Sequence, residues 1–360
     1  MFFNTGDELR QDANTPWPSA WRVRRLLHSG AHYRIYEVAN AMGEMEDQRA
    51  VVKLLRYDPR RVADAHYVDA LRQRLRRECE TLAHFSPRLP EPLDYFTVYN
   101  DQDAFGGFGE EQLRRSEPAL VQTFMHGQSI QELMVRHGAP PAAAEKLLLA
   151  LARVCAFLDE LHAGGNGWLF FALTPEHVIL DPDLDFEPTF VGTSNLRALR
   201  RGLAPHDPLA ASVDLPEPGY AAPEALCNGL ADRRTDIYAV GAMLFHIFTG
   251  VDPRDLVADV SDLSLDEDAA SSSPLLPLTQ HEAFDLAERL HRSMERFCRR
   301  NLKGLGIHRA KVRKIILKCT SPDPADRFDS PLELRDAIVT SLRRSMKMAW
   351  PAAVEVGGEE

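Results

Sequence analysis

The chain has 360 residues, of which 44% are hydrophobic and 26% charged, and its formal net charge is −11. This composition excludes a mainly disordered chain and a fibrous repeat, and the length corresponds to about two domains or lobes. The excess of acidic over basic residues is the opposite of what a phosphate-coating protein carries, so we expect no nucleic-acid partner.

The first part of the chain predicts a small β-rich lobe. Residues 1–20 are polar and proline-containing, which favours a flexible leader. Residues 50–55 form a compact apolar run typical of a buried strand, and apolar residues recur at helical spacing over 61–84. Strand-like patterns return over 93–125, interrupted by a glycine-containing loop. We therefore expect an N-terminal lobe over 21–125 with one prominent helix.

The pattern then becomes mainly helical, and we assign a second, larger lobe to residues 126–345. Residues 129–132, Ser-Ile-Gln-Glu, are a capping box that predicts the start of a short helix. Residues 142–163 predict a long helix with an apolar face. Two short strands are expected at 178–180 and 189–191, before the remaining helices.

Two segments near the C-terminus are predicted to lie outside the packed core. Residues 259–277 are acidic, Ser-rich and proline-containing, which is typical of a solvated loop. Residues 281–300 then predict an amphipathic helix rich in Glu and Arg. We expect residues 346–360 to be a flexible tail.

The spacing of the cysteines and the length of the apolar runs predict where in the cell the chain is located. No two cysteines form a Cys-x-x-Cys pair, so we expect buried free thiols and a cytoplasmic location. The first residues lack the pattern of a signal peptide. The longest apolar runs, 147–158 and 237–249, fall short of the ~20 residues that span a bilayer, so no membrane insertion is expected. The cysteines are Cys79, Cys155, Cys227, Cys298 and Cys319.

Three segments carry a family resemblance. Residues 219–224 read Gly-Tyr-Ala-Ala-Pro-Glu, residues 235–250 begin Thr-Asp-Ile-Tyr-Ala-Val-Gly, and residues 322–328 read Pro-Asp-Pro-Ala-Asp-Arg-Phe. In this order and spacing they resemble the eukaryotic-like protein kinases, especially the bacterial Ser/Thr branch, from about residue 21 to 342. The resemblance implies an α+β fold with two lobes: a small β-rich N-lobe with one main helix and a larger, mostly helical C-lobe.

The resemblance also implies structural roles for three charged residues. Glu224 would pair with Arg327 and tie the end of the activation segment to the later helices. Asp236, at the N-terminal end of a buried helix, would accept hydrogen bonds from backbone amides of the catalytic loop.

Several residues match positions that contact ATP in kinases. Lys53 closes a Val-Val-Lys strand and matches the lysine that touches the α- and β-phosphates. Its usual partner is a glutamate on the next helix, for which Glu78 fits best and Glu80 is the fallback. A different reading of Lys53, as a solvated lysine on an edge strand, stays open.

The loop and linker that hold the nucleotide in kinases are only partly matched. Gly30 is the one glycine left of G-x-G-x-x-G, since His28 and Tyr33 replace the outer two. Side chains there weaken a cradle made of backbone amides. The resemblance also places Gln122 at the gatekeeper position, followed by Thr123 and Met125, whose backbone groups would face an adenine if one binds.

The groups that would perform phosphoryl transfer are missing. A kinase uses H-R-D-L-x-x-x-N, in which Asp is the base and Asn holds a metal ion. Here Phe170, Phe171 and Ala172 stand for His, Arg and Asp, and His177 stands for Asn. The methyl group of Ala172 cannot accept a proton as the aspartate would. Glu176 is the one acidic residue between residues 161 and 180.

The second metal ligand is missing too. Gly192 occupies the Asp position of D-F-G, and the adjoining segment contains no acid that a shift in alignment would recover. His177, the adjacent Glu176 and the aspartates at 181, 183 and 185 are the groups that a rescued site would use. A hydrogen-bonded loop histidine and a solvated turn of aspartates explain them more simply. We therefore expect no metal ligand and no catalytic residue in this chain.

These losses favour a pseudokinase that acts as scaffold or allosteric regulator of a signalling partner. The expected partner is a protein: a kinase, a substrate or a regulator. Nucleotide binding would be weak or absent, and any ATP would be held without Mg²⁺. Two alternatives stay open: an active but degenerate Ser/Thr kinase that transfers the ATP γ-phosphate to a protein, and another nucleotidyl- or phosphotransferase on the same fold.

Overall fold

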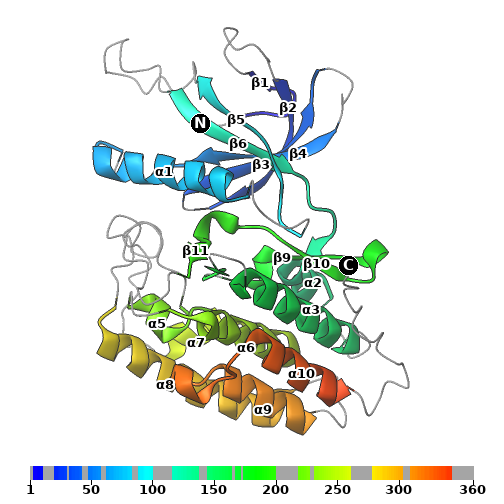
Figure 1. Cartoon of the computed structure of the whole chain (residues 1–360), viewed down its shortest axis with the longest axis vertical. Helices are drawn as coiled ribbons and strands as arrows, with labels where there is room; N and C mark the ends of the chain where they lie inside the picture. The colour runs from blue at the N-terminus through cyan, green and yellow to red at the C-terminus, as the bar shows by residue number, and fades with distance from the viewer. Residues whose placement is uncertain are drawn as a thin grey trace, which may run out of the picture.

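The structure of the chain is a computed structural model with two lobes. Figure 1 shows the strands of the N-terminal lobe and one long helix at one end of the molecule, and a body of helices at the other. The predicted α+β, two-lobed architecture is therefore confirmed. The described residues are 3–10, 20–30, 32–42, 48–57, 62–82, 88–99, 116–137, 144–163, 167–171, 173–199, 218–227, 231–260, 278–302 and 309–342.

The N-lobe is an antiparallel sheet of strand order β1-β2-β3-β4-β6-β5. One face packs on the long helix α1 (Ala65–Leu82) through Leu71, Leu75 and Leu120. The opposite face forms a second apolar cluster that includes Trp21 and Val38. The strands are β1 (Glu8–Arg10), β2 (Ala20–Ser29), β3 (Tyr33–Asn40), β4 (Arg49–Leu55), β5 (Pro92–Tyr99) and β6 (Ser116–Thr123).

The flexible leader expected over residues 1–20 is wrong for its first half. Residues 8–10 form β1, which pairs with β2 in antiparallel register. Leu9 is buried in the apolar cluster beside Trp21, and the ring of Phe3 packs edge-on against Tyr36. Burial of Leu9 and partial burial of Phe3 draw a mostly polar segment onto the sheet edge.

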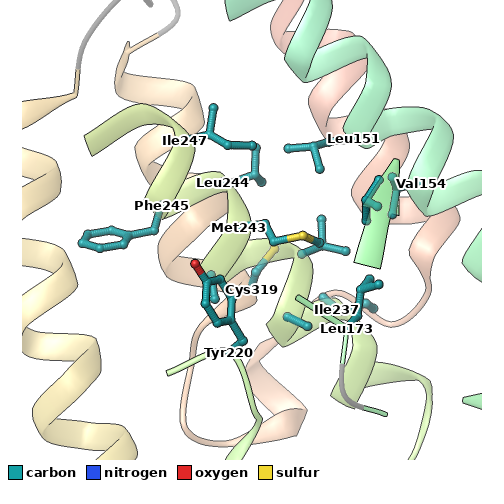
Figure 2. Close-up of a cluster of buried hydrophobic side chains, with 14 of the residues drawn as sticks. Leu151, Val154, Leu173, Tyr220, Ile237, Met243, Leu244, Phe245, Ile247 and Cys319 are labelled. Atoms are coloured by element: carbon teal, nitrogen blue, oxygen red, sulfur yellow. The ribbon is translucent and has the colours of Figure 1, made fainter. Parts of the chain in front are cut away.

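The C-lobe is built around α6 (Arg233–Thr249), which is buried along almost its whole length. Figure 2 shows Met243, Leu244 and Ile247 of α6 gathered near Leu151 and Val154 of α3. Around α6 lie α2 (Ile130–His137), α3 (Ala144–Ala163), α5 (Pro223–Leu226), α7 (Pro253–Val260), α8 (Gln280–Asn301), α9 (Arg309–Cys319) and α10 (Pro331–Leu342).

Short elements at the N-lobe side of the helical body hold the loops of interest. They are β7 (Gln128–Ser129), β8 (Trp168–Leu169), the 3₁₀ turn η4 (Pro175–His177), β9 (Val178–Asp181), the turn η5 (Pro182–Leu184), β10 (Glu187–Phe190), the turn η6 (Thr193–Asn195) and β11 (Arg197–Ala198). The turn η8 (Pro324–Asp326) lies elsewhere, between α9 and α10 in the sequence. Strand β9 lies between β10 and β7, and β11 pairs with β8.

The local predictions for the C-lobe agree with these elements, with small changes at the ends. The capping box forms, since the Ser129 and Glu132 side chains each accept the other's backbone N–H. The first residues of the expected 259–277 loop still belong to α7, which ends at Val260. The rest of that loop and the expected tail lie outside the described residues.

Candidate functional site

The expected pair between Lys53 and Glu78 is present. The Lys53 Nζ lies 2.6 Å from the Glu78 Oε1, and both side chains are buried. Glu78 stands one turn beyond Leu75 on the sheet-facing side of α1, which points its carboxylate at β4. Glu80 faces solvent instead and pairs with Arg76, so the fallback assignment is not the one that forms.

The same carboxylate joins the two lobes. The buried Thr193 hydroxyl of η6 donates to the Glu78 Oε1 at 2.7 Å. One turn earlier on α1, the Arg74 guanidinium donates to the carbonyl and hydroxyl oxygens of Ser194, both at 3.4 Å. Helix α1 is therefore held against the segment that contains Gly192 by side chains of the protein itself.

Side chains occupy both altered positions of the β2–β3 turn. A β-carbon built on Gly30 would come 2.8 Å from the His28 Nε2. Tyr33 is 9% exposed, and its ring centroid lies 5.0 Å from the Lys53 Nζ and 5.5 Å from the Arg74 Cζ. The turn is closed by the Gly30 N–H, which donates to the Tyr33 carbonyl.

The segment that joins the lobes places its candidate residues as follows. Gln122 is buried on the same face of the sheet as Lys53, and its Nε2 has no hydrogen-bond partner among the described residues. The Thr123 N–H donates to the Glu91 carbonyl, and the Thr123 hydroxyl lies 3.9 Å from the Met125 sulfur. Contact of Thr123 and Met125 with an adenine stays a prediction.

Asp236 holds the backbone of the loop that stands for H-R-D. Its carboxylate accepts the N–H groups of Phe170 and Phe171, both at 2.8 Å, and lies 2.9 Å from the His162 Nε2. Phe171 adopts a left-handed φ of 68°, which is strained for a non-glycine residue. The next residue, Ala172, lies outside the described residues.

The Phe171 ring serves a different purpose from the arginine that it replaces. It packs with Leu169 and Ala225, and the Arg197 guanidinium lies 4.3 Å from its centroid. Arg197 belongs to β11, whose pairing with β8 adds backbone hydrogen bonds at the same place. A cation–π contact therefore helps to hold β11 against the loop that contains Phe171.

The His177 ring lies in the space that a side chain at position 192 would occupy. Gly192 has a left-handed φ of 75°, and a β-carbon built on it would lie 2.1 Å from the His177 Cδ2 and 2.5 Å from its Nε2. The ring is oriented by the Thr174 hydroxyl, 3.1 Å from its Nδ1. His177, which stands at the position of the metal-binding Asn, therefore fills the space that a side chain in place of Gly192, at the position of the metal-binding Asp, would need.

Magnesium does not fit this arrangement. Mg²⁺ takes oxygen ligands in near-octahedral geometry, whereas an imidazole and a glycine stand here. Among the residues that the structure describes, no group of three or more His, Cys, Asp or Glu side chains is placed to hold a metal ion. The three aspartates that a rescued site would use belong to the turn after β9, where Asp181 caps η5 and Asp185 pairs with Arg153.

Glu176, the acid nearest to Ala172 in sequence, is engaged elsewhere. Its Oε1 lies 2.8 Å from the Arg254 Nη2, and Arg254 also pairs with Asp252. Burial acts to raise the pKa of Glu176, but hydrogen bonds from Thr174 and Arg254 outweigh it and lower that pKa. A carboxylate that holds its proton less tightly than usual is a poorer general base.

The Glu224–Arg327 pair forms deep in the C-lobe. The two Nη atoms of Arg327 lie 2.7 and 3.0 Å from the two carboxylate oxygens of Glu224. Arg327 also donates to the backbone carbonyls of Ser321, Pro322 and Arg234, so its fork of donors is almost fully used.

The chain is similar to known protein kinases in sequence, although no protein-family model matches it. The serine/threonine-protein kinase PknL of Mycobacterium tuberculosis is 27% identical over 161 residues, which are 44% of this chain and 38% of PknL. PrkC of Bacillus subtilis is 21% identical over 322 residues, which are 89% of this chain and 40% of PrkC. The chain therefore spans well under half the length of these relatives.

Solved structures show the same fold. The PknI kinase domain of Mycobacterium tuberculosis has a TM-score of 0.52 and 20% identity, over 95% of this chain and 100% of that one. The structure described as PpkA-294 apo form has a TM-score of 0.53 and 14% identity, over 88% of this chain and 95% of that one.

In the part of the chain described here, no helix combines the length and apolar character needed to cross a bilayer.

Sequence reasoning missed the contacts that join the lobes. It assigned no role to Arg74, whereas the structure buries this side chain toward η6. The available signal was spacing, because Arg74 lies four residues before Glu78 and so shares its helix face. No comparable signal marked Thr193 or the Arg197 contact with Phe171.

Proposed function

We propose that this chain, which is related to the bacterial serine/threonine protein kinases and has their fold, is a pseudokinase. In this role it transfers no phosphate and acts as a scaffold or allosteric regulator through a protein partner in the cytoplasm. The observation that carries the proposal is the His177 ring in the space beside Gly192. Together with Ala172, it removes the base and both metal ligands from the places where a kinase needs them.

The size of these losses supports inactivity. A positioned general base contributes about 10²–10⁴-fold to a rate, and a bound metal ion adds several kcal/mol of charge stabilisation. Glu176 does not compensate, because Arg254 holds its carboxylate and lowers its pKa. The pairs that survive, Lys53–Glu78 and Glu224–Arg327, are ones that also brace the fold.

The first prediction is that the purified chain transfers no phosphate from [γ-³²P]ATP to itself or to a general protein substrate, with Mg²⁺ or Mn²⁺. The matched control is Lys53→Ala, whose radioactivity should equal that of the unaltered chain. Incorporation that Lys53→Ala abolishes would refute the proposal, because a contaminating kinase would label both proteins equally.

A degenerate but active Ser/Thr kinase is the second candidate. The buried 2.6 Å contact between Lys53 and Glu78 favours it, since this pair positions phosphates in kinases. It predicts stabilisation by ATP that requires Mg²⁺ or Mn²⁺, which a thermal-shift titration with and without metal measures. The pseudokinase proposal predicts no metal-dependent rise in melting temperature.

A further inference from the structure

Basic side chains are concentrated in one part of this acidic chain. Between residues 289 and 318 the sequence has eleven arginines and lysines and a single acidic residue, whereas the whole chain has a net charge of −11. The described residues of this stretch lie mainly in the second half of α8 and in α9, which Figure 1 shows at the end of the helical body away from the N-lobe. A strongly positive region on a negative protein attracts anionic groups locally.

Four arginines of α8 form a ridge along one exposed face of the helix. They follow one another at intervals of three, four and four residues, which stacks their side chains because a helical turn has about 3.6 residues. The opposite side of α8 packs on the C-lobe core through Leu290 and Met294. The arginine ridge consists of Arg289, Arg292, Arg296 and Arg300, all of them exposed.

Ordinary structural roles account for only part of this ridge. Attraction to the helix dipole is confined to the last turn, so it applies to Arg300 and not to the other three arginines. The Arg292 guanidinium lies 3.3 Å from the Glu288 carboxylate, but both side chains are more than 60% exposed. Such pairs contribute little to stability, so a partner's carboxylate can replace Glu288 at small cost. Arg296 donates to the Ser293 hydroxyl at 2.8 Å, which uses one of its five N–H donors.

We propose that the arginine ridge docks an extended, carboxylate-rich segment of a partner protein. The proposal rests on the proposed function, because it gives the protein partner of the pseudokinase a binding surface and a chemistry. Side chains on one face of an extended segment repeat every ~6.6 Å, and successive ridge positions rise by about 4.5–6 Å along α8. Long arginine side chains cover this difference. Acidic residues at alternate positions of the segment can therefore each meet a guanidinium, which binds a carboxylate through two parallel hydrogen bonds.

The distribution of charge favours a short acidic segment over a larger polyanion. Salt screens charges that lie more than about 8 Å apart at physiological ionic strength, so a peptide on the ridge interacts mainly with the arginines. A nucleic acid or an anionic membrane extends beyond the ridge and would also face acidic parts of the surface, which repel it. One such part is the first half of α8, which contains Glu282, Asp285 and Glu288.

The test is the fluorescence anisotropy of a labelled peptide of alternating Glu and Ser residues, titrated with the full chain. The ridge variant is Arg292→Gln/Arg296→Gln. The matched control is Lys311→Gln/Lys314→Gln, which removes the same charge from exposed positions on α9. We expect the ridge variant to bind at least about fivefold more weakly than the unaltered chain, and the control to differ by about twofold or less. Melting curves check folding, and Arg292→Gln/Arg300→Gln replaces the ridge variant if that variant does not fold.

Several outcomes would overturn the docking proposal. They are no binding of the Glu-Ser peptide, a loss in the control as large as in the ridge variant, equal binding of a Gln-Ser peptide, or tighter binding to single-stranded DNA or phosphatidylserine vesicles. The result is separable from the proposed function. Phosphate transfer by the unaltered chain refutes the pseudokinase whatever the ridge binds, and failure to bind the peptide leaves the phosphate-transfer assay unaffected.

Discussion

Replacing Arg327 by Met is expected to lower the free energy of unfolding by about 3–5 kcal/mol. The Arg327 side chain is fully buried, and Glu224 is 7% exposed. Without the guanidinium, the Glu224 carboxylate keeps only the Thr235 hydroxyl, at 2.9 Å, as a side-chain partner among the described residues. Three backbone carbonyls would lose a donor as well. Urea denaturation followed by circular dichroism measures the change.

The control for this prediction is the double variant Glu224→Gln/Arg327→Met. It removes the uncompensated charge, so it should be more stable than Arg327→Met alone, as is common when both members of a buried pair are replaced. A loss below about 1 kcal/mol for Arg327→Met would show that the pair behaves like a surface salt bridge and contradict this account.

Replacing Gly192 by Ala is expected to lower the free energy of unfolding by about 2–4 kcal/mol, more than a usual Gly-to-Ala change. Alanine is strained at a φ of 75°, and its methyl group would overlap the His177 ring, 2.1 Å from the ideal β-carbon position. In a His177→Ala background the overlap disappears and only the backbone strain remains. The unaltered chain, the two single variants and the double variant form a double-mutant cycle. Urea denaturation of the four proteins gives the coupling free energy between the two positions, which we expect to be at least ~1 kcal/mol.

A second double-mutant cycle introduces the metal-binding residues of a kinase, Asn at position 177 and Asp at position 192. Gly192→Asp alone should destabilise the chain, whereas His177→Asn/Gly192→Asp should recover stability, since Asn is smaller and Asp tolerates left-handed backbone. If the effects at the two positions simply add, the two side chains do not compete for one space and the structural argument for inactivity loses its main support.

The architecture was predictable because its signals are local. The segments 219–224, 235–250 and 322–328 carry glycine, proline and charged residues whose spacing marks particular turns and pairs. Helices α3 and α6 were visible as long apolar patterns. The first strand was not predictable, because three residues are too few to show a period of their own. Their pairing with β2 and the burial of Leu9 exist only once the sheet has formed.

At the candidate site, residue identity alone established which acidic groups are absent. Gly192 and His177 cannot supply carboxylate oxygens in any conformation, and neither can Ala172. What has replaced those groups depends on atoms brought together from distant parts of the chain. The Thr193–Glu78 hydrogen bond spans 115 residues and the Arg74–Ser194 contact spans 120. Such pairings emerge only when two lobes pack, because a contact between remote residues leaves no periodic trace in either segment.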